Sequence, residues 1–175
     1  MTVDDGTPEA AQIIVMGVSG SGKSTIGALI AGALGVPFVD ADALHPQSNV
    51  EKMAGGTPLT DEDRWPWLAK VGSTLAEAGR NGTGIVIACS ALRRSYRDTI
   101  LTNAPSARFV YLSGSREVLE SRLEGRKGHF MPATLLDSQF ATLEPLAADE
   151  PGVVVDIDRP VAEIVSDAVH ALGRS

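Results

Sequence analysis

The chain has 175 residues, the size of one ordinary domain, and such a domain buries roughly two-thirds of its unfolded surface without disulfides or metals. Its single cysteine excludes an internal disulfide framework, and its net charge of −7 argues against nonspecific binding to nucleic acid or to a membrane. No apolar stretch approaches the length of a membrane span and no signal-peptide pattern is present, so we expect a cytoplasmic protein.

The chain is predicted to begin with a disordered tail over 1–11, because these residues are polar and aperiodic, and to continue as a single domain over 12–175. Short apolar runs then alternate with amphipathic segments. Five runs suit buried strands: 13–16, 36–39, 85–89, 108–112 and 153–157. Helical spacing occupies 61–80, 91–103, 117–124 and 161–172. This alternation predicts an α/β fold, with helices on both faces of a parallel sheet and ligands at the carboxyl ends of its strands.

The segment 17–24 reads GVSGSGKS and fits the phosphate-binding pattern G-x-x-x-x-G-K-[ST]. It follows the first apolar run and opens a helical pattern, which is the context this loop requires. Backbone N–H groups would surround phosphate oxygens, Lys23 would reach the β- and γ-phosphates, and Ser24 would bind Mg²⁺. The alternative is a Gly-rich turn with a chance lysine. The ATP-binding candidates here are Gly17, Ser19, Gly20, Ser21, Gly22, Lys23, Ser24 and Thr25.

Two carboxylates, Asp40 and Asp42, end the second predicted strand. Their i, i+2 spacing places both on one side of an extended backbone. We expect Asp40 to hold Mg²⁺ through water and Asp42 to accept the proton of an acceptor hydroxyl. The alternative is a solvated turn. Asp156 also follows an apolar run, but this run is predicted to form an edge strand, which places Asp156 in a loop near the nucleotide base.

Further segments resemble the gluconate kinases, a family of the nucleoside-monophosphate-kinase-like and shikimate-kinase-like group. They span nearly the whole domain: DADALHP at 40–46, NVEKM at 49–53, PLTDEDRWPWL at 58–68, CSALR at 89–93, YRD at 96–98, RKGHF at 126–130 and VDID at 155–158. The segments at 40–46 and 61–68 are not general features of phosphate loops. The resemblance implies a three-layer α/β/α sandwich with a five-stranded parallel sheet, the P-loop NTP hydrolase fold, and a mobile lid at about 122–135.

The resemblance also implies a reaction, the ATP-dependent phosphorylation of D-gluconate at its 6-hydroxyl, with Mg²⁺ as cofactor and 6-phosphogluconate and ADP as products. It suggests a homodimer. Gluconate carries one carboxylate and several hydroxyls, so its site needs a cation and polar groups. Arg64 is the candidate for the carboxylate, and a surface ion pair is the alternative. The substrate-binding candidates are Asp42, His45, Lys52, Arg64, Arg93, Arg97 and His129.

The segment 122–129 resembles the lid entrance of adenylate-kinase-like enzymes, which implies that Arg122 stacks on adenine and that Arg126 contacts the transferring phosphate. Both lie on one helical face, and for Arg122 a solvated face is the alternative. Pro160 would border the adenine. Cys89 is read as a buried small residue, and Trp65 and Trp67 as packing residues. A shikimate-kinase-like or other small-molecule kinase is the alternative function, whereas a nucleotide-dependent switch is disfavoured because guanine-binding and switch motifs are lacking.

Overall fold

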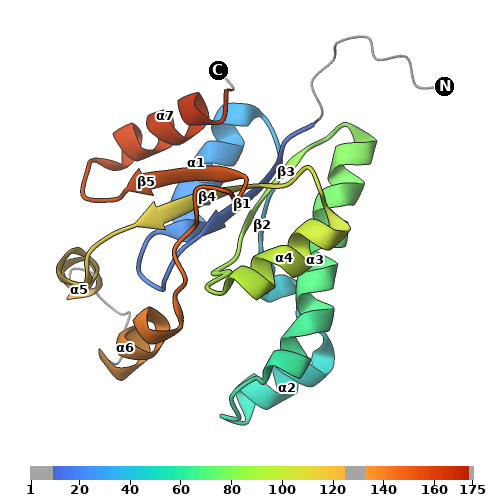
Figure 1. Cartoon of the computed structure of the whole chain (residues 1–175), viewed down its shortest axis with the longest axis vertical. Helices are drawn as coiled ribbons and strands as arrows, with labels where there is room; N and C mark the ends of the chain where they lie inside the picture. Colours follow the sequence, from blue (N-terminus) through green and yellow to red (C-terminus); the bar gives the residue numbers. More distant parts are fainter. Residues whose placement is uncertain (1–9, 125–132, 174–175) are drawn as a thin grey trace.

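A computed structural model describes residues 10–124 and 133–173 of the chain (Figure 1). Five strands in this part of the chain alternate with helices, as the apolar runs predict. The elements are β1 (Gln12–Met16), α1 (Lys23–Leu34), β2 (Phe38–Asp40), the 3₁₀ helix η1 (Ala41–Leu44), α2 (Gln47–Ala54), α3 (Asp61–Asn81), β3 (Ile85–Ala88), α4 (Arg94–Asn103), β4 (Arg108–Ser113), α5 (Arg116–Glu124), α6 (Ala133–Thr142), β5 (Gly152–Asp156) and α7 (Val161–Ala171).

The five strands form one parallel sheet in the order β2-β3-β1-β4-β5, which confirms the predicted α/β/α sandwich. β1 is the central strand, paired with β3 on one side and β4 on the other. β5 lies at the edge, as its position in the sequence predicts. The loop after β1 therefore opens at the middle of the sheet, where the carboxyl ends of neighbouring strands can supply further side chains.

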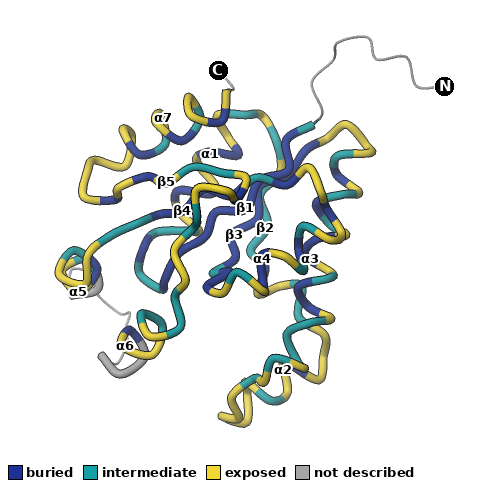
Figure 2. Tube along the Cα trace, in the orientation of Figure 1, coloured by how far each residue is buried: buried dark blue, intermediate teal, exposed yellow. Residues whose placement is uncertain are grey.

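The core consists of two apolar layers, one on each face of the sheet. Successive residues of a strand point to opposite faces, so Ile13 and Val15 pack under α1 and α7, whereas Ile14 and Met16 pack under α3 and α4. Figure 2 shows the central strands buried and the outer helix faces exposed. A continuous apolar run such as 13–16 is what a strand covered on both faces requires.

The N-terminus of α3 is fixed by local hydrogen bonds. The Thr60 side chain accepts a hydrogen bond from the Asp63 N–H at 3.3 Å, and the Asp63 carboxylate accepts one from the Thr60 N–H at 2.9 Å, forming a capping box. Gly72 then allows α3 to cross α4 closely, because a Cβ there would lie 2.8 Å from the Ile100 carbonyl oxygen. Figure 1 shows α2 beyond the lower end of α3, away from the sheet.

The structure corrects several predicted boundaries. β2 covers Phe38–Asp40 rather than 36–39. α4 begins at Arg94 rather than 91, because Ala91 has φ 46°, a left-handed conformation that no helix accommodates. Ala11 was predicted in the tail, but it is buried and its carbonyl accepts the Ile85 N–H at 2.8 Å. Residues 1–9 lie outside the described part. The helices α2 and α6 were not predicted.

Candidate functional site

The phosphate-binding loop joins β1 to α1 at the centre of the sheet. Gly17 has φ +149°, and a Cβ there would lie 2.8 Å from the buried Ser21 hydroxyl, so only glycine fits. Gly20 also has positive φ, and Gly22 caps α1 in the left-handed conformation. The helix that follows begins at Lys23 and continues through Ser24 and Thr25. The backbone N–H groups of the loop and the positive end of the α1 dipole are therefore directed toward the same space above the N-terminus of α1, as anion binding requires.

Contacts within the loop involve the Val18 carbonyl. It accepts hydrogen bonds from the Lys23 ammonium at 3.1 Å and from the Ser21 N–H at 3.2 Å. The Gly17 N–H donates to the Ser90 carbonyl at 3.3 Å, which ties the loop to the chain that follows β3. The Lys23 ammonium therefore lies beside the Val18 carbonyl, against the loop that precedes its own helix.

Asp40 lies directly beside the loop. Its carboxylate accepts a hydrogen bond from the Ser24 hydroxyl at 3.0 Å and another from the Asp42 N–H at 2.9 Å. Asp42 belongs to η1 and not to an extended strand, which corrects the predicted shared strand face, but the Asp40 cap still keeps the two residues together. The Ser24 and Asp40 oxygens are suitable for Mg²⁺, which is usually bound by one or two protein oxygens together with waters and phosphates. The described residues contain no larger cluster of metal-binding side chains.

The electrostatics of Asp42 suit a proton acceptor. Partial burial and then the charge of Asp40 raise the pKa of Asp42, while His45 and Lys23 partly oppose the shift. A raised pKa makes a carboxylate a better base, because proton acceptance is then less unfavourable near neutral pH. Asp40, by contrast, already accepts two hydrogen bonds, from Ser24 and from the Asp42 N–H.

His45 is oriented by two neighbours. Its ring stacks on Trp67 with centroids 4.1 Å apart, and its Nδ1 lies 3.1 Å from the Asn49 amide nitrogen. Because an amide nitrogen only donates, Nδ1 accepts and Nε2 carries the proton. Burial lowers the pKa of His45, so the neutral ring presents one N–H donor. Trp67 is buried and donates to the Ala41 carbonyl at 2.8 Å, which confirms its packing role and adds a platform for His45.

Arg64 lies in a network that the sequence did not reveal. Its guanidinium contacts the Asp61 carboxylate at 3.2 Å and the Tyr96 hydroxyl at 3.4 Å, and Tyr96 donates to Asp61 at 2.7 Å. The Tyr96 hydrogen bond is the main cause of the lowered pKa of Asp61, to which Arg64 and Arg93 also contribute. Arg93 is exposed at the N-cap of α4. Two arginines therefore lie near one carboxylate and one phenol.

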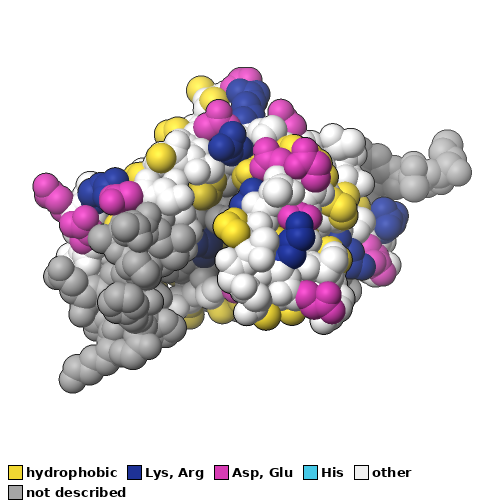
Figure 3. Space-filling model, turned by 90° about the horizontal axis from the view of Figure 1, so that it is seen from below, with side chains coloured by type: hydrophobic (Ala, Val, Ile, Leu, Met, Phe, Trp, Pro, Cys, Tyr) yellow, Lys and Arg dark blue, Asp and Glu magenta, His cyan; other side chains and the backbone are white. Residues whose placement is uncertain are grey.

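A pocket of about 230 Å³ opens between α3, α4 and α6, and we call it the polar pocket. Figure 3 shows this end of the molecule from below, with a hollow beside the rounded lobe that carries α2 and Lys and Arg side chains next to the hollow. Donors and acceptors from several elements meet in the polar pocket, as a polyol site requires. It is lined by Arg64, Trp67, Leu68, Ser90, Ala91, Leu92, Tyr96, Ser138, Gln139 and Thr142.

The structure corrects the expectation that Arg97 contacts the substrate. Its side chain is fully buried, and its guanidinium is paired with the Glu150 carboxylate at 2.6 and 3.0 Å. Burial alone would raise the pKa of Glu150, but hydrogen bonds from Arg97 and from the Ala147 N–H outweigh it and lower that pKa. Arg97 also donates to the Ala91 carbonyl at 2.8 Å. It therefore holds the left-handed turn that borders the polar pocket, without reaching a ligand.

Lys52 already has a carboxylate partner. Its ammonium contacts both oxygens of Asp63, at 3.0 and 2.8 Å, and so joins α2 to the capping box of α3. The ion pair lowers the pKa of Asp63 to about 2, with the Thr60 N–H as the next cause. The Lys52 side chain remains 41% exposed, which leaves one side of the ammonium open to solvent.

Arg122 lies beside the phosphate loop. Its guanidinium donates to the Ile157 carbonyl, and one of its nitrogens would lie 3.9 Å from a Cβ at Gly22. Pro160 caps the N-terminus of α7 just beyond. The space between the loop and the end of β5 is where an adenine was predicted. The other predicted lid residues, Arg126 and His129, lie outside the described residues.

Cys89 takes no part in the chemistry of the site. Cys89 is buried, and burial raises its pKa to about 12, so it is no nucleophile.

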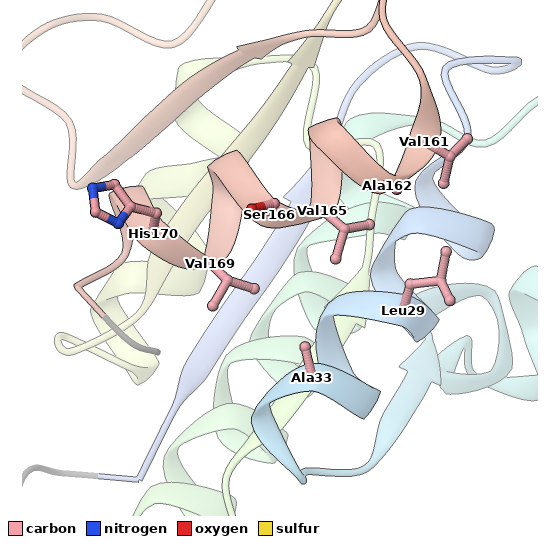
Figure 4. A pocket seen from close by; sticks show the side chains of 8 residues that line it. All are labelled: Leu29, Ala33, Val161, Ala162, Val165, Ser166, Val169 and His170. Atoms are coloured by element: carbon pink, nitrogen blue, oxygen red, sulfur yellow. The ribbon is translucent and has the colours of Figure 1, made fainter.

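A groove of about 620 Å³ lies between α1 and α7 (Figure 4), lined by Leu29, Ala33, Val161, Ala162, Val165, Ser166, Val169 and His170. Its apolar lining suits neither phosphate nor a polyol. None of the helices within 10–124 and 133–173 has the length and apolarity to cross a bilayer.

Sequence reasoning missed three groups at the site: Asp61, Tyr96 and Gln139. Asp61 and Tyr96 entered the sequence analysis only as members of the resembling segments 58–68 and 96–98. Gln139 gave no signal, because its partner Ser19 lies 120 positions earlier in the chain. Such contacts arise only when the folded sheet brings separate loops together.

Comparisons with known proteins place these features in a family. A family model described as an AAA domain matches residues 13–146. The chain is 50% identical to a gluconokinase of Gluconobacter oxydans and 44% identical to the thermoresistant gluconokinase of Escherichia coli, with 90% and 91% of this chain and 89% and 91% of those proteins covered. A crystal structure of a gluconokinase from Sinorhizobium meliloti superposes with a TM-score of 0.84 at 49% identity, covering 95% of this chain and 94% of that one.

Proposed function

The chain belongs to the gluconokinase family, and on this premise we propose that it transfers the γ-phosphoryl group of ATP to the 6-hydroxyl of D-gluconate, giving 6-phosphogluconate and ADP. The observation that carries the proposal is that the phosphate loop and the polar pocket lie next to each other. The phosphate loop meets the polar pocket at Ser19 and Gln139, and Asp42 lies beside both Asp40 and His45. The family relation favours gluconate over shikimate as the acceptor.

On the nucleotide side, N–H groups of 17–24 and the Lys23 ammonium bind the β- and γ-phosphates and oppose the charge that spreads over the transferring group. Mg²⁺ is the proposed cofactor, held by Ser24 and through water by Asp40, where it would neutralise phosphate charge. Arg122 and Pro160 border the adenine. We propose that Arg126 contacts the transferring phosphate and that His129 contacts the substrate.

On the acceptor side, Arg64 binds the gluconate carboxylate, because its guanidinium is held by Asp61 and Tyr96 at the wall of the polar pocket. His45 donates from Nε2 to a hydroxyl, and Arg93 and Lys52 add positive charge at the rim. Asp42 accepts the proton of the 6-hydroxyl as the phosphoryl group moves. Because phosphoryl transfer passes through a loose transition state, Asp42 mainly orients the hydroxyl and takes its proton late.

We also propose that the protein is cytoplasmic, as expected from its sequence, and that it forms a homodimer, as the family resemblance implies. Cell fractionation tests the first statement. Light scattering on the purified chain tests the second, where a mass of about 18.3 kDa, that of one copy, would contradict it.

The reaction is tested by coupled ADP release with gluconate, shikimate, other sugar acids and no acceptor. We expect release with gluconate far above the other assays, and a phosphorus NMR signal of a phosphate ester on carbon 6. Equal release without acceptor would indicate an ATPase, and release with shikimate alone would establish the alternative kinase.

A further inference from the structure

The structure assigns a role to Gln139, and the assignment rests on the proposed function. We propose that Gln139 competes with ATP for the phosphate loop and, once displaced, contacts the acceptor in the polar pocket. It is a positioning residue that makes the two substrates bind in a coupled way. The proposal rests on one side-chain amide, that of Gln139, which contacts the phosphate loop and also lines the polar pocket.

The contact with the loop uses both ends of the amide. The Gln139 carbonyl oxygen accepts the Ser19 backbone N–H at 2.5 Å, and its nitrogen donates to the Ser19 hydroxyl at 2.8 Å. Ser19 is the third residue of the phosphate-binding pattern, and the N–H groups of that loop are the donors that hold phosphate oxygens. A phosphate oxygen and the Gln139 oxygen therefore compete for the same hydrogen.

The helix that carries Gln139 is held from other sides. Arg116 at the start of α5 pairs with Asp137 and lies over the Phe140 ring, 5.0 Å from its centroid. Just after α6, the Glu144 N–H donates to the Leu92 carbonyl at 2.7 Å. With α6 anchored at these points, release of the amide from Ser19 requires only a rotation of one side chain.

The released amide stays within reach of the acceptor. Gln139 lines the polar pocket together with Arg64 and Tyr96, and a glutamine amide offers both donor and acceptor atoms, which suits a chain of hydroxyls. Binding of ATP thus frees the group that contacts gluconate. The affinity for gluconate rises when nucleotide is present, and by linkage the affinity for nucleotide rises with gluconate.

The test compares Gln139→Ala with the parent chain and with the exposed Gln47→Ala as matched control. Binding of a non-hydrolysable ATP analogue with Mg²⁺ is measured by calorimetry, and gluconate KM by ADP release at saturating ATP. For Gln139→Ala we expect nucleotide affinity to rise and gluconate KM to increase, each by about 2- to 10-fold, the range for one net hydrogen bond. A merely structural role would weaken both.

A second variant separates competition from packing. Gln139→Glu keeps the acceptor for the Ser19 N–H but adds a negative charge beside the phosphates, so its nucleotide affinity should fall below that of the parent. Unchanged or weakened nucleotide binding in Gln139→Ala, or an unchanged gluconate KM, would overturn the assignment. Failure of the proposed function is recognised separately, since the parent chain would then release no ADP with gluconate.

Discussion

The phosphate loop and the polar pocket are built in different ways. The loop is one segment of eight residues between β1 and α1, and its geometry follows from its own glycines and the helix it opens. The pocket draws on α3, the turn after β3, α4 and α6, and its walls depend on groups such as Arg97 that never meet the ligand. We therefore expect substitutions in the loop to remove chemistry from a stable protein, whereas substitutions around the pocket change stability, affinity or both.

The largest effect is expected on stability, at Arg97, which holds the turn beside the polar pocket. Arg97→Ala leaves the Glu150 carboxylate buried without its partner, which should lower the free energy of unfolding by about 3–5 kcal/mol. Chemical denaturation measures this. The neighbouring exposed pair Arg94 and Asp149 provides the control, because solvent screens this pair and Arg94→Ala should cost far less stability than Arg97→Ala. Equal losses for the two variants would contradict the supporting role of Arg97.

A loop variant should show the opposite behaviour. Lys23→Ala removes the charge beside the phosphates, and we expect turnover to fall by about 10² or more while the unfolding midpoint changes little. The exposed Lys70→Ala serves as control. A folded Lys23→Ala with near-parental turnover would remove the loop from the catalytic mechanism.

Asp42 lies where the two regions meet. Asp42→Asn removes the proton acceptor, so kcat should fall by about 10² with ATP binding preserved, as a binding titration would show. Asp40→Asn should instead raise the Mg²⁺ concentration needed for activity, because the hydrated metal loses a charged partner. If the two variants exchange these behaviours, the two roles are reversed.

Arg64→Ala should change affinity for one substrate only. A hydrogen-bonded charge contributes about 1.5–3 kcal/mol, so gluconate KM should rise roughly 10- to 150-fold with little change in the KM for ATP. Arg80→Ala, at the other end of the same helix, is the control. Parallel rises in both KM values would assign Arg64 to the structure of the pocket.

The smallest effect concerns pH. The raised pKa of Asp42 predicts that kcat falls with acid at a higher pH than an ordinary carboxyl would give, because the protonated form cannot accept the hydroxyl proton. Removing the neighbouring charge by Asp40→Asn should move this acid limb to lower pH, measured at saturating Mg²⁺. A shift to higher pH would mean that the limb belongs to another group.

The same contrast explains what sequence could predict. The loop and the five strands follow from local patterns, and the structure confirms them; the capping box of Thr60 and Asp63 is equally local, since its partners are three positions apart. The partners of Arg97 and Gln139 could not be predicted, since Glu150 lies 53 positions away and Ser19 lies 120. A buried ion pair and a substrate-binding arginine look alike in sequence, because both are cations on an amphipathic helix. Only packing distinguishes them.

The carboxylate of Asp63 determines how the junction of α2 and α3 responds to pH. It closes the capping box of α3 and holds Lys52 of α2, so one carboxylate joins the two helices that flank His45. Because its pKa is lowered to about 2, this stabilisation is complete above the ordinary carboxyl range and disappears as the pH falls through about 2. The response of the α2–α3 junction to acid is thus set by one partly buried carboxylate, independently of the apolar layers that hold the sheet together.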